Sequence, residues 1–187
     1  MSSFDSKPTV LTVHPSTPND AVRSLGVRVR AEKSDILVFH YSLDADMSRV
    51  RVPASGVGGP ADALWKHTCF EAFVADADAS GYHEFNFSPS RDWAIYRFSA
   101  YREGMSRAGM DAAPEISVRR CDGGLELEST VRLSHLAGLR DARLLRVAMA
   151  AVIEDGAGGL SYWGLRHAPG KPDFHHPHGF ALEVVRS

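Results

Sequence analysis

The chain has 187 residues, of which 44% are hydrophobic and 24% charged, and its formal net charge is −2. The length favours a single domain, residues 1–187, with a substantial buried core. The charge balance excludes a general nucleic-acid binder, and the lack of a run of about 18 apolar residues excludes a membrane-spanning helix. The first residues lack the basic start and apolar stretch of a secretory signal, so we expect a cytoplasmic protein.

Strand patterns follow one another through the first half of the chain. The clear ones are Ile36–Leu43, Lys66–Val74, Tyr82–Ser88 and Trp93–Ser99; Val27–Arg30 is a weaker segment, and Arg49–Pro53 is a segment that runs into a Gly- and Pro-containing loop. Ile36–Leu43 has branched and aromatic residues on both faces, which is typical of a central strand. The turn-type residues Pro89–Asp92 separate the last two of the clear segments, so we expect these to be antiparallel neighbours.

The second half continues in the same way after a polar connection at residues 102–114. Its strand patterns are Ile116–Arg120, Leu125–Val131, Leu144–Ile153, Leu160–His167 and Phe180–Val185. Asp122, Gly123 and Gly124 predict a hairpin between the first two, because they supply the positive φ that tight turns need. Ser134 can cap one short helical turn. Nine or so short strands predict an all-β fold, a single antiparallel β-sandwich.

Aromatic and hydrogen-bonding side chains are densest between Trp65 and Trp93, which span two of three Trp and four of nine Phe. Flat apolar rings beside polar groups are typical of a small-molecule pocket, and an indole can stack on a sugar ring. Side chains suited to forked hydrogen bonds with its hydroxyls are Glu71, Glu84, Asn86, Arg91 and Arg166. Each Trp, Trp163 included, could instead anchor the core. For the stacking surface we expect Trp93 or Trp163 rather than Trp65.

The carboxylates have two interpretations each. Glu71 interrupts the apolar run CFEAFV, which predicts a buried carboxylate paired with Arg91, Arg166 or a His. Its partner could equally be a ligand. Glu84 and Asn86 lie two residues apart and project from one sheet face, which suits a hold on vicinal hydroxyls or, equally, a solvated outer face.

The segment KPDFHHPH, residues 171–178, raises the question of a metal site. Asp173, His176 and His178 are residue types that bind zinc or copper. Pro177 interrupts the geometry and no second ligand pair is visible, so we favour a His-rich loop with Phe174 tucked into the core and expect no metal.

Catalytic patterns are weak in this sequence. It has no GxSxG, no HExxH and no phosphate-binding glycine loop. Glu71 with Glu84 could imitate the paired carboxylates of a glycosidase, and His67 with Cys69 a Cys–His pair, but no spacing fixes either. Cys69 and Cys121 are far apart in sequence, so we expect two reduced thiols. We therefore expect a binding protein and no catalytic residues.

Four segments together resemble the DOMON-like superfamily, whose β-sandwiches are related to family 9 carbohydrate-binding modules and to the cytochrome domains of some dehydrogenases. They are LWKHTCFEAFV (64–74), YHEFNFSPSRDWAIYRF (82–98), LELESTVRLSHLAGL (125–139) and SYWGLRHAPGKPDFHHPHGF (161–180). The resemblance covers roughly residues 25–185. It is strongest to bacterial DOMON-like proteins of unknown function that share LWKHTCFE and PDFH.

The resemblance implies two kinds of ligand. The ligand residues of sugar-binding members fall at Trp65, Glu71, Asn86, Arg91, Trp93, Trp163 and Arg166. Haem-binding members hold haem b with an axial Met and His, for which Met47, Met105, Met110 and Met149 are available. We expect a non-catalytic module without a cofactor, whose partner is a small polyhydroxylated, sugar-like molecule. The alternatives are a haem b or metal-binding protein and a protein–protein adaptor.

Overall fold

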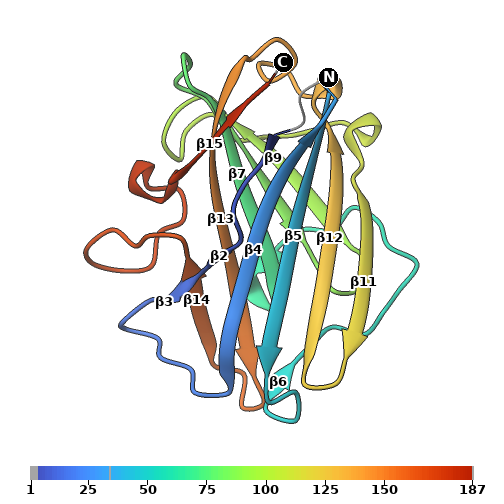
Figure 1. Ribbon diagram of the computed structural model, residues 1–187, viewed down its shortest axis with the longest axis vertical. Coiled ribbons are helices and arrows are strands. Elements are labelled where there is room, and N and C mark those ends of the chain that lie inside the picture. The colour runs from blue at the N-terminus through green and yellow to red at the C-terminus, as the bar shows by residue number, and fades with distance from the viewer. Residues whose placement is uncertain (1–3, 34, 187) are drawn as a thin grey trace.

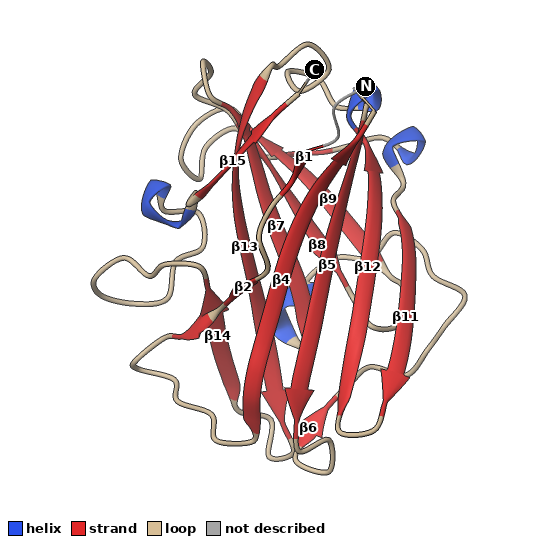
Figure 2. Ribbon diagram, in the orientation of Figure 1, coloured by secondary structure: helices blue, strands red, loops and turns tan. Residues whose placement is uncertain are grey.

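The computed structural model describes residues 4–33 and 35–186 and contains two β-sheets packed face to face (Figure 1). Every ladder between its strands is antiparallel, which confirms the β-sandwich. The described residues form no α-helix, and none of their helical turns could cross a membrane. Four 3₁₀ turns occur where one helical turn was expected (Figure 2). They are η1 (Leu64–Lys66), η2 (Met110–Ala112), η3 (Leu133–His135) and η4 (Pro177–Gly179).

The first sheet has the order β1-β4-β5-β12-β11, with β2 paired to β4 (Figure 1). Its strands are β1 (Phe4–Asp5), β2 (Thr9–Val10), β4 (Val22–Glu32), β5 (Ile36–Ala45), β11 (Glu115–Cys121) and β12 (Gly124–Arg132). The expected hairpin is confirmed, because β11 and β12 pair around Gly123, whose φ is 74°.

The second sheet has the order β10-β9-β8-β7-β13-β14-β3, and β6 and β15 also pair with β13. Its strands are β3 (Thr12–Val13), β6 (Val50–Arg51), β7 (Cys69–Asp76), β8 (Tyr82–Phe87), β9 (Trp93–Phe98), β10 (Ser106–Arg107), β13 (Leu144–Asp155), β14 (Leu160–Gly164) and β15 (Leu182–Val185). β8 and β9 are antiparallel neighbours joined by the turn 88–92, as expected.

The first sheet has one apolar and one charged face. In β4, Leu25 and Val29 are fully buried in the core, whereas Arg28 and Arg30 alternate with them and remain partly exposed. Arg30 lies 3.1 Å from the carboxylate of Glu128 across the sheet. This alternation is why β4 and β12 have the pattern of half-buried strands.

The second sheet is covered on both faces. Phe70 and Val74 of β7 face the core between the sheets, whereas Phe73 belongs to a separate apolar cluster on the outer face. Phe174 and Phe180, from the segment between β14 and β15, pack against that outer cluster. Since both faces are buried, β7 has apolar residues at consecutive positions. The chain thus lays residues 165–181 over the outer face of the second sheet.

The structure adds three strands that were not foreseen and corrects one local expectation. The segment before residue 22 contributes three short strands, of which β1 and β2 pair with β4 and β3 with β14. Ser134 lies inside η3 rather than at its cap, and its hydroxyl donates to Asp35 Oδ2 at 2.9 Å. Asp35 thereby joins the β4–β5 turn to the segment after β12.

Candidate functional site

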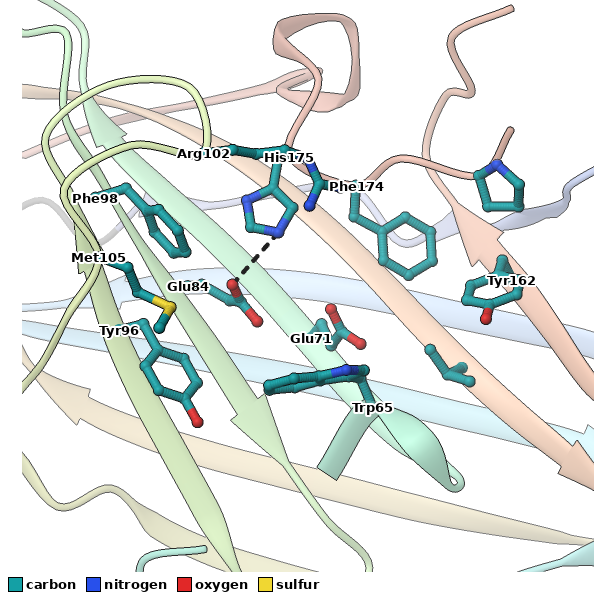
Figure 3. A pocket seen from close by; sticks show the side chains of 12 residues that line it. Trp65, Glu71, Glu84, Tyr96, Phe98, Arg102, Met105, Tyr162, Phe174 and His175 are labelled. Atoms are coloured by element: carbon teal, nitrogen blue, oxygen red, sulfur yellow. Dashed lines mark ion pairs between the residues drawn. The ribbon is translucent and has the colours of Figure 1, made fainter. Parts of the chain in front are cut away.

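A cavity of about 480 Å³ opens on the outer face of the second sheet (Figure 3). Its floor comes from strands β7, β8, β9, β13 and β14, and its rim from η1 and the segments 99–105 and 165–181. The residues that line it are Trp65, Glu71, Glu84, Tyr96, Phe98, Arg102, Met105, Val152, Tyr162, Pro172, Phe174 and His175. The volume lies within the usual range for small-molecule sites.

Two carboxyl groups project into this cavity from adjacent strands (Figure 3). Glu71 is 3% exposed and Glu84 is 6% exposed. Asn86, which is fully buried, donates to Glu84 Oε1 at 2.8 Å. Glu71 Oε1 is buried and has no hydrogen-bond partner among the residues that the structure describes. Such an atom normally costs about 1–3 kcal/mol, so it marks a place where a ligand donor would be stabilising.

The two carboxyl groups disfavour each other's ionisation. Burial, and next the charge of Glu84, raise the pKa of Glu71 well above its usual value. Burial also raises the pKa of Glu84, although the Asn86 amide and the Arg102 guanidinium act in the opposite direction. The pair therefore holds a proton to higher pH than isolated carboxyls do.

His175 contacts this pair from above the sheet (Figure 3). Its Nε2 lies 3.5 Å from Glu84 Oε2, and its Nδ1 lies 2.7 Å from the Tyr82 hydroxyl. The same hydroxyl accepts a hydrogen bond from the backbone N–H of Arg102, so its own proton is free to be donated to His175 Nδ1. The proton of the neutral imidazole is then assigned to Nε2. Burial, and then Arg102, lower the pKa of His175 to about 4, so the contact with Glu84 is that of a neutral ring at pH 7.

Asp173 fixes the rim. Its carboxylate accepts hydrogen bonds from Arg102 Nη2 at 2.7 Å and from the backbone N–H of His175 at 3.1 Å. The Tyr101 hydroxyl donates a third hydrogen bond to it. These bonds connect the segment after β9 with the segment after β14. Both segments carry residues that line the cavity, so Asp173 positions the rim without lining the cavity itself.

Aromatic rings form the walls. Trp65 is 39% exposed, and its indole meets the ring of Tyr96 edge-on with centroids 6.1 Å apart. The Tyr96 hydroxyl donates to Asp62 at 2.5 Å, which fixes that ring. On the opposite side Phe174 packs against Tyr162 at 5.9 Å. Figure 3 draws the Trp65 indole near the carboxylate of Glu71 in this view, and both side chains line the cavity, so one flat ring and one acidic group border the same space.

The protonation of His175 predicts a loss of stability on acidification. Its pKa in the folded state is about 4, against an ordinary value of 6.5, so its contribution is present above pH 6.5 and is lost as the pH falls toward 4. His175→Gln retains an acceptor for Tyr82 and a donor for Glu84 without titrating. Between pH 7 and pH 4.5 we expect the parent to lose about 1–3 kcal/mol more free energy of unfolding than the variant. Urea denaturation at both pH values measures this, and equal losses would contradict it.

Glu71 predicts the opposite dependence. A folded-state pKa above the unfolded one stabilises the protein below about pH 4.5 and weakens it as the pH rises through the folded pKa. Glu71→Gln removes this titration, so the variant should gain stability over the parent between pH 5 and pH 8. Guanidinium denaturation at the two pH values tests it, with Glu128→Gln on the exposed face of the first sheet as the control. A variant whose advantage shrinks at higher pH would refute this assignment.

The structure separates the expected ligand residues into three groups. Trp65, Glu71 and Glu84 line the cavity. Asn86 is directed at Glu84 and reaches a ligand only through it. The others lie outside the cavity wall formed by the described residues: Trp93, Trp163, Arg91 and Arg166.

Trp93 and Trp163 were expected to offer a stacking surface to a ligand, but they do not lie on the surface of the cavity. Both are 6% exposed and belong to the core between the sheets. Trp93 is opposite Phe87 in the β8–β9 hairpin, so it shares the inward face. Trp163 donates its indole N–H to Ser161 at 3.0 Å inside the core. Trp65 alone of the three is available to a ligand.

Glu71 is buried, as expected, but its expected pairing with an arginine or histidine was wrong. Arg91 is exposed on the β8–β9 turn and donates to the carbonyl of Gly56, and Arg166 is exposed after β14. Glu84 is the charged neighbour that perturbs Glu71.

Several cavity residues were not foreseen. They are Tyr96, Phe98, Arg102, Met105, Val152, Tyr162, Pro172, Phe174 and His175. The hairpin register contains a signal for two of them, because Tyr96 and Phe98 alternate with inward-facing Ile95 and so share the face of Glu84. Phe174 had been expected in the core, but it packs on the outer face of the second sheet.

The His-rich segment has structural contacts. Asp173 pairs with Arg102, and the backbone N–H of His178 donates to His176 Nδ1 at 3.1 Å. Within residues 4–33 and 35–186, no three His, Cys, Asp or Glu side chains converge in a way that could hold a metal ion. Cys69 is buried and Cys121 exposed, and both are free thiols. His67 lies 2.8 Å from Glu154 rather than beside Cys69.

Carbohydrate-binding modules of known structure share this fold. A protein from Bacteroides uniformis ATCC 8492 to which carbohydrate binding is attributed has a TM-score of 0.70 at 18% identity, over 92% of this chain and 83% of that one. A family 9 carbohydrate-binding module from Caldicellulosiruptor kristjanssonii in complex with cellotriose has a TM-score of 0.54 at 9% identity, over 88% and 74%. A module of this family and organism in complex with glucose has a TM-score of 0.54 at 9% identity, over 94% and 83%.

At these identities the likeness shows a shared β-sandwich fold and nothing finer. No protein-family model and no curated protein matches the sequence.

Proposed function

We propose that the chain is a non-catalytic, DOMON-like binding module that holds a small polyhydroxylated, sugar-like ligand in the cavity over the second sheet. The observation that carries this proposal is an accessible indole, Trp65, that lines the same open cavity of about 480 Å³ as two buried carboxyl groups, Glu71 and Glu84. The carbohydrate-binding modules of the same fold add support at the level of architecture.

The cavity offers each part of a sugar a suitable neighbour. The apolar C–H face of a pyranose can stack on the Trp65 ring, and its hydroxyls can donate to Glu71 Oε1, which lacks a donor in the described structure. Arg102 at the rim is a donor for ring or hydroxyl oxygens. Rings on the other walls exclude water from these bonds.

The arrangement does not favour catalysis. Cys69 is completely buried, and burial followed by the charge of Glu71 raises the pKa of its thiol well above the usual value, which makes it a poor nucleophile. Glu71 and Glu84 lie side by side on one floor rather than on opposite sides of a ligand position (Figure 3). A glycosidase requires its two carboxyls to flank the scissile bond.

Haem b does not fit the residues of this cavity. It would need a Met and a His as axial ligands on either side of an apolar slot. Met105 lines the cavity, but His175 has Nδ1 engaged with Tyr82 and Nε2 directed at Glu84. Met149 is buried in the core and Met47 packs against that core. A porphyrin would also have to cover the two buried carboxyl groups without a counter-charge.

A thermal-shift screen of monosaccharides, disaccharides and polyols tests the proposal. A ligand that binds the folded state raises the melting temperature by mass action, and a 100-fold excess over Kd stabilises by about 2.7 kcal/mol. We expect at least one hexose derivative to raise the melting temperature in a saturable manner. If no compound in the screen does so at millimolar concentration, a protein–protein adaptor becomes the better account.

A further inference from the structure

We propose that the cavity selects a cationic sugar, an amino sugar whose ammonium group sits between Glu71 and Glu84. This inference rests on the proposed function and names the chemical class of its ligand. It starts from the two buried carboxyl groups on the floor of the cavity.

Acidic side chains outnumber basic ones that are charged at neutral pH in the lining of the cavity. Glu71 and Glu84 are the two acidic groups of the wall, and Arg102 is its one arginine. Arg102 is already paired with Asp173 at 2.7 Å. His175 is the remaining titratable base of the wall, and burial keeps it neutral at pH 7. Among the described lining residues, no positively charged side chain therefore forms an ion pair with either carboxyl group, although Arg102 acts on the pKa of Glu84 through its charge.

The hydrogen bonds show the same deficit. Glu84 Oε1 has the Asn86 amide as a donor, and Glu84 Oε2 has the imidazole of His175 at 3.5 Å. Glu71 Oε1 is buried without a partner in the described part of the chain. A sugar hydroxyl offers one proton, whereas an ammonium group offers three donors and a full positive charge. It can satisfy Glu71 and approach Glu84 together, which a hydroxyl cannot do.

The aromatic walls suit the same ligand. Ammonium groups are attracted to the faces of Trp and Tyr rings, and the attraction increases when water is excluded. Trp65 and Tyr96 lie on the side of the cavity next to the carboxyl groups (Figure 3). The sugar ring can stack on the indole while its amine reaches the floor. An aromatic wall and an acidic floor together distinguish this cavity from a simple patch of acidic residues.

The test compares three ligands that share one pyranose ring. D-glucosamine carries the ammonium group, N-acetyl-D-glucosamine carries a neutral amide at the same carbon, and D-glucose carries a hydroxyl there. Calorimetry with the parent protein at pH 7 should show D-glucosamine binding at least ~10-fold more tightly than the other two, the effect of one charge-assisted hydrogen bond. This comparison needs no variant and hence no assumption about folding.

Variants then assign the preference to the floor. Glu71→Gln and Glu84→Gln each should bring the ratio of the glucosamine and glucose affinities close to one. Glu128→Gln, the same substitution on the exposed face of the first sheet, should leave the ratio unchanged. A preference that persists in both floor variants overturns the inference.

The outcomes separate this inference from the proposed function. If all three sugars bind within about twofold of one another, the site is neutral-selective, which overturns the inference and leaves the proposed function intact. If none of the three binds and the wider sugar screen is also negative, both fall together.

Discussion

Replacing Trp163 or Trp93 by Ala is expected to lower the free energy of unfolding by about 3–5 kcal/mol, the cost of removing a large aromatic side chain from a core. Both side chains are 6% exposed within the core between the sheets. Trp163→Ala in addition leaves Ser161 without the indole N–H that donates to it at 3.0 Å. Trp65→Ala should cost about 1 kcal/mol or less, because Trp65 is 39% exposed.

Urea denaturation of the three single variants measures the contrast. Trp163→Phe serves as the matched control, since it keeps an aromatic ring and should lose less stability than Trp163→Ala. If Trp65→Ala destabilises the protein as much as Trp163→Ala does, then Trp65 is a core residue, and its assignment to the cavity wall is wrong.

Trp65→Ala is expected to weaken ligand binding by about 10- to 100-fold, which corresponds to roughly 1.4–2.7 kcal/mol. The indole is the accessible Trp ring of the cavity and lies beside Glu71, so truncating it removes the largest apolar area that a sugar ring can cover (Figure 3). Calorimetry with the monosaccharide that gives the largest thermal shift measures this loss.

Trp65→Phe provides the control for that experiment. It retains a flat ring of smaller area, so its affinity should lie between those of the parent and the Ala variant. A Trp65→Ala protein that is folded and binds like the parent would show that ring stacking on this residue does not contribute.

The sequence predicts the strands well because alternation and turn residues are local properties. β8 and β9 were anticipated within a residue or so, and so was the hairpin at Gly123. When both faces of a sheet are apolar, the alternation of side chains along a strand does not show which face is the inner one. Phe73 on the outer face of β7 is as hydrophobic as Phe70 on the inner one. The two faces of the second sheet thus look alike in sequence.

The error over the tryptophans follows from this ambiguity. The hairpin places Trp93 on the same face as Phe87, because a short turn sets the two residues opposite each other, but it does not identify that face as the inner one. Trp163 has no comparable local signal. Trp65 lies in η1, outside any strand, so no period assigns it to a face. Its exposure depends on how η1 packs against β8 and β7.

The residues at the rim of the cavity could not be predicted from local sequence patterns, for a different reason. Arg102 and His175 are 73 positions apart, and Asp173 joins their segments through contacts that only the folded chain provides. Glu71 illustrates the same limit. Its burial follows from its apolar neighbours, but the charged group that raises its pKa is a second carboxyl on the next strand, and the expected counter-ion does not lie beside it.

The most direct test of the central claim, that the cavity beside Trp65 binds the ligand, is an NMR titration of protein labelled with ¹⁵N-tryptophan. The three indole N–H signals report on three positions, and Trp65→Phe assigns one of them. With the strongest ligand of the screen, the Trp65 signal is predicted to shift in a saturable manner, while those of the buried Trp93 and Trp163 shift little. A Trp65 signal that stays in place while the ligand saturates the protein would contradict the account.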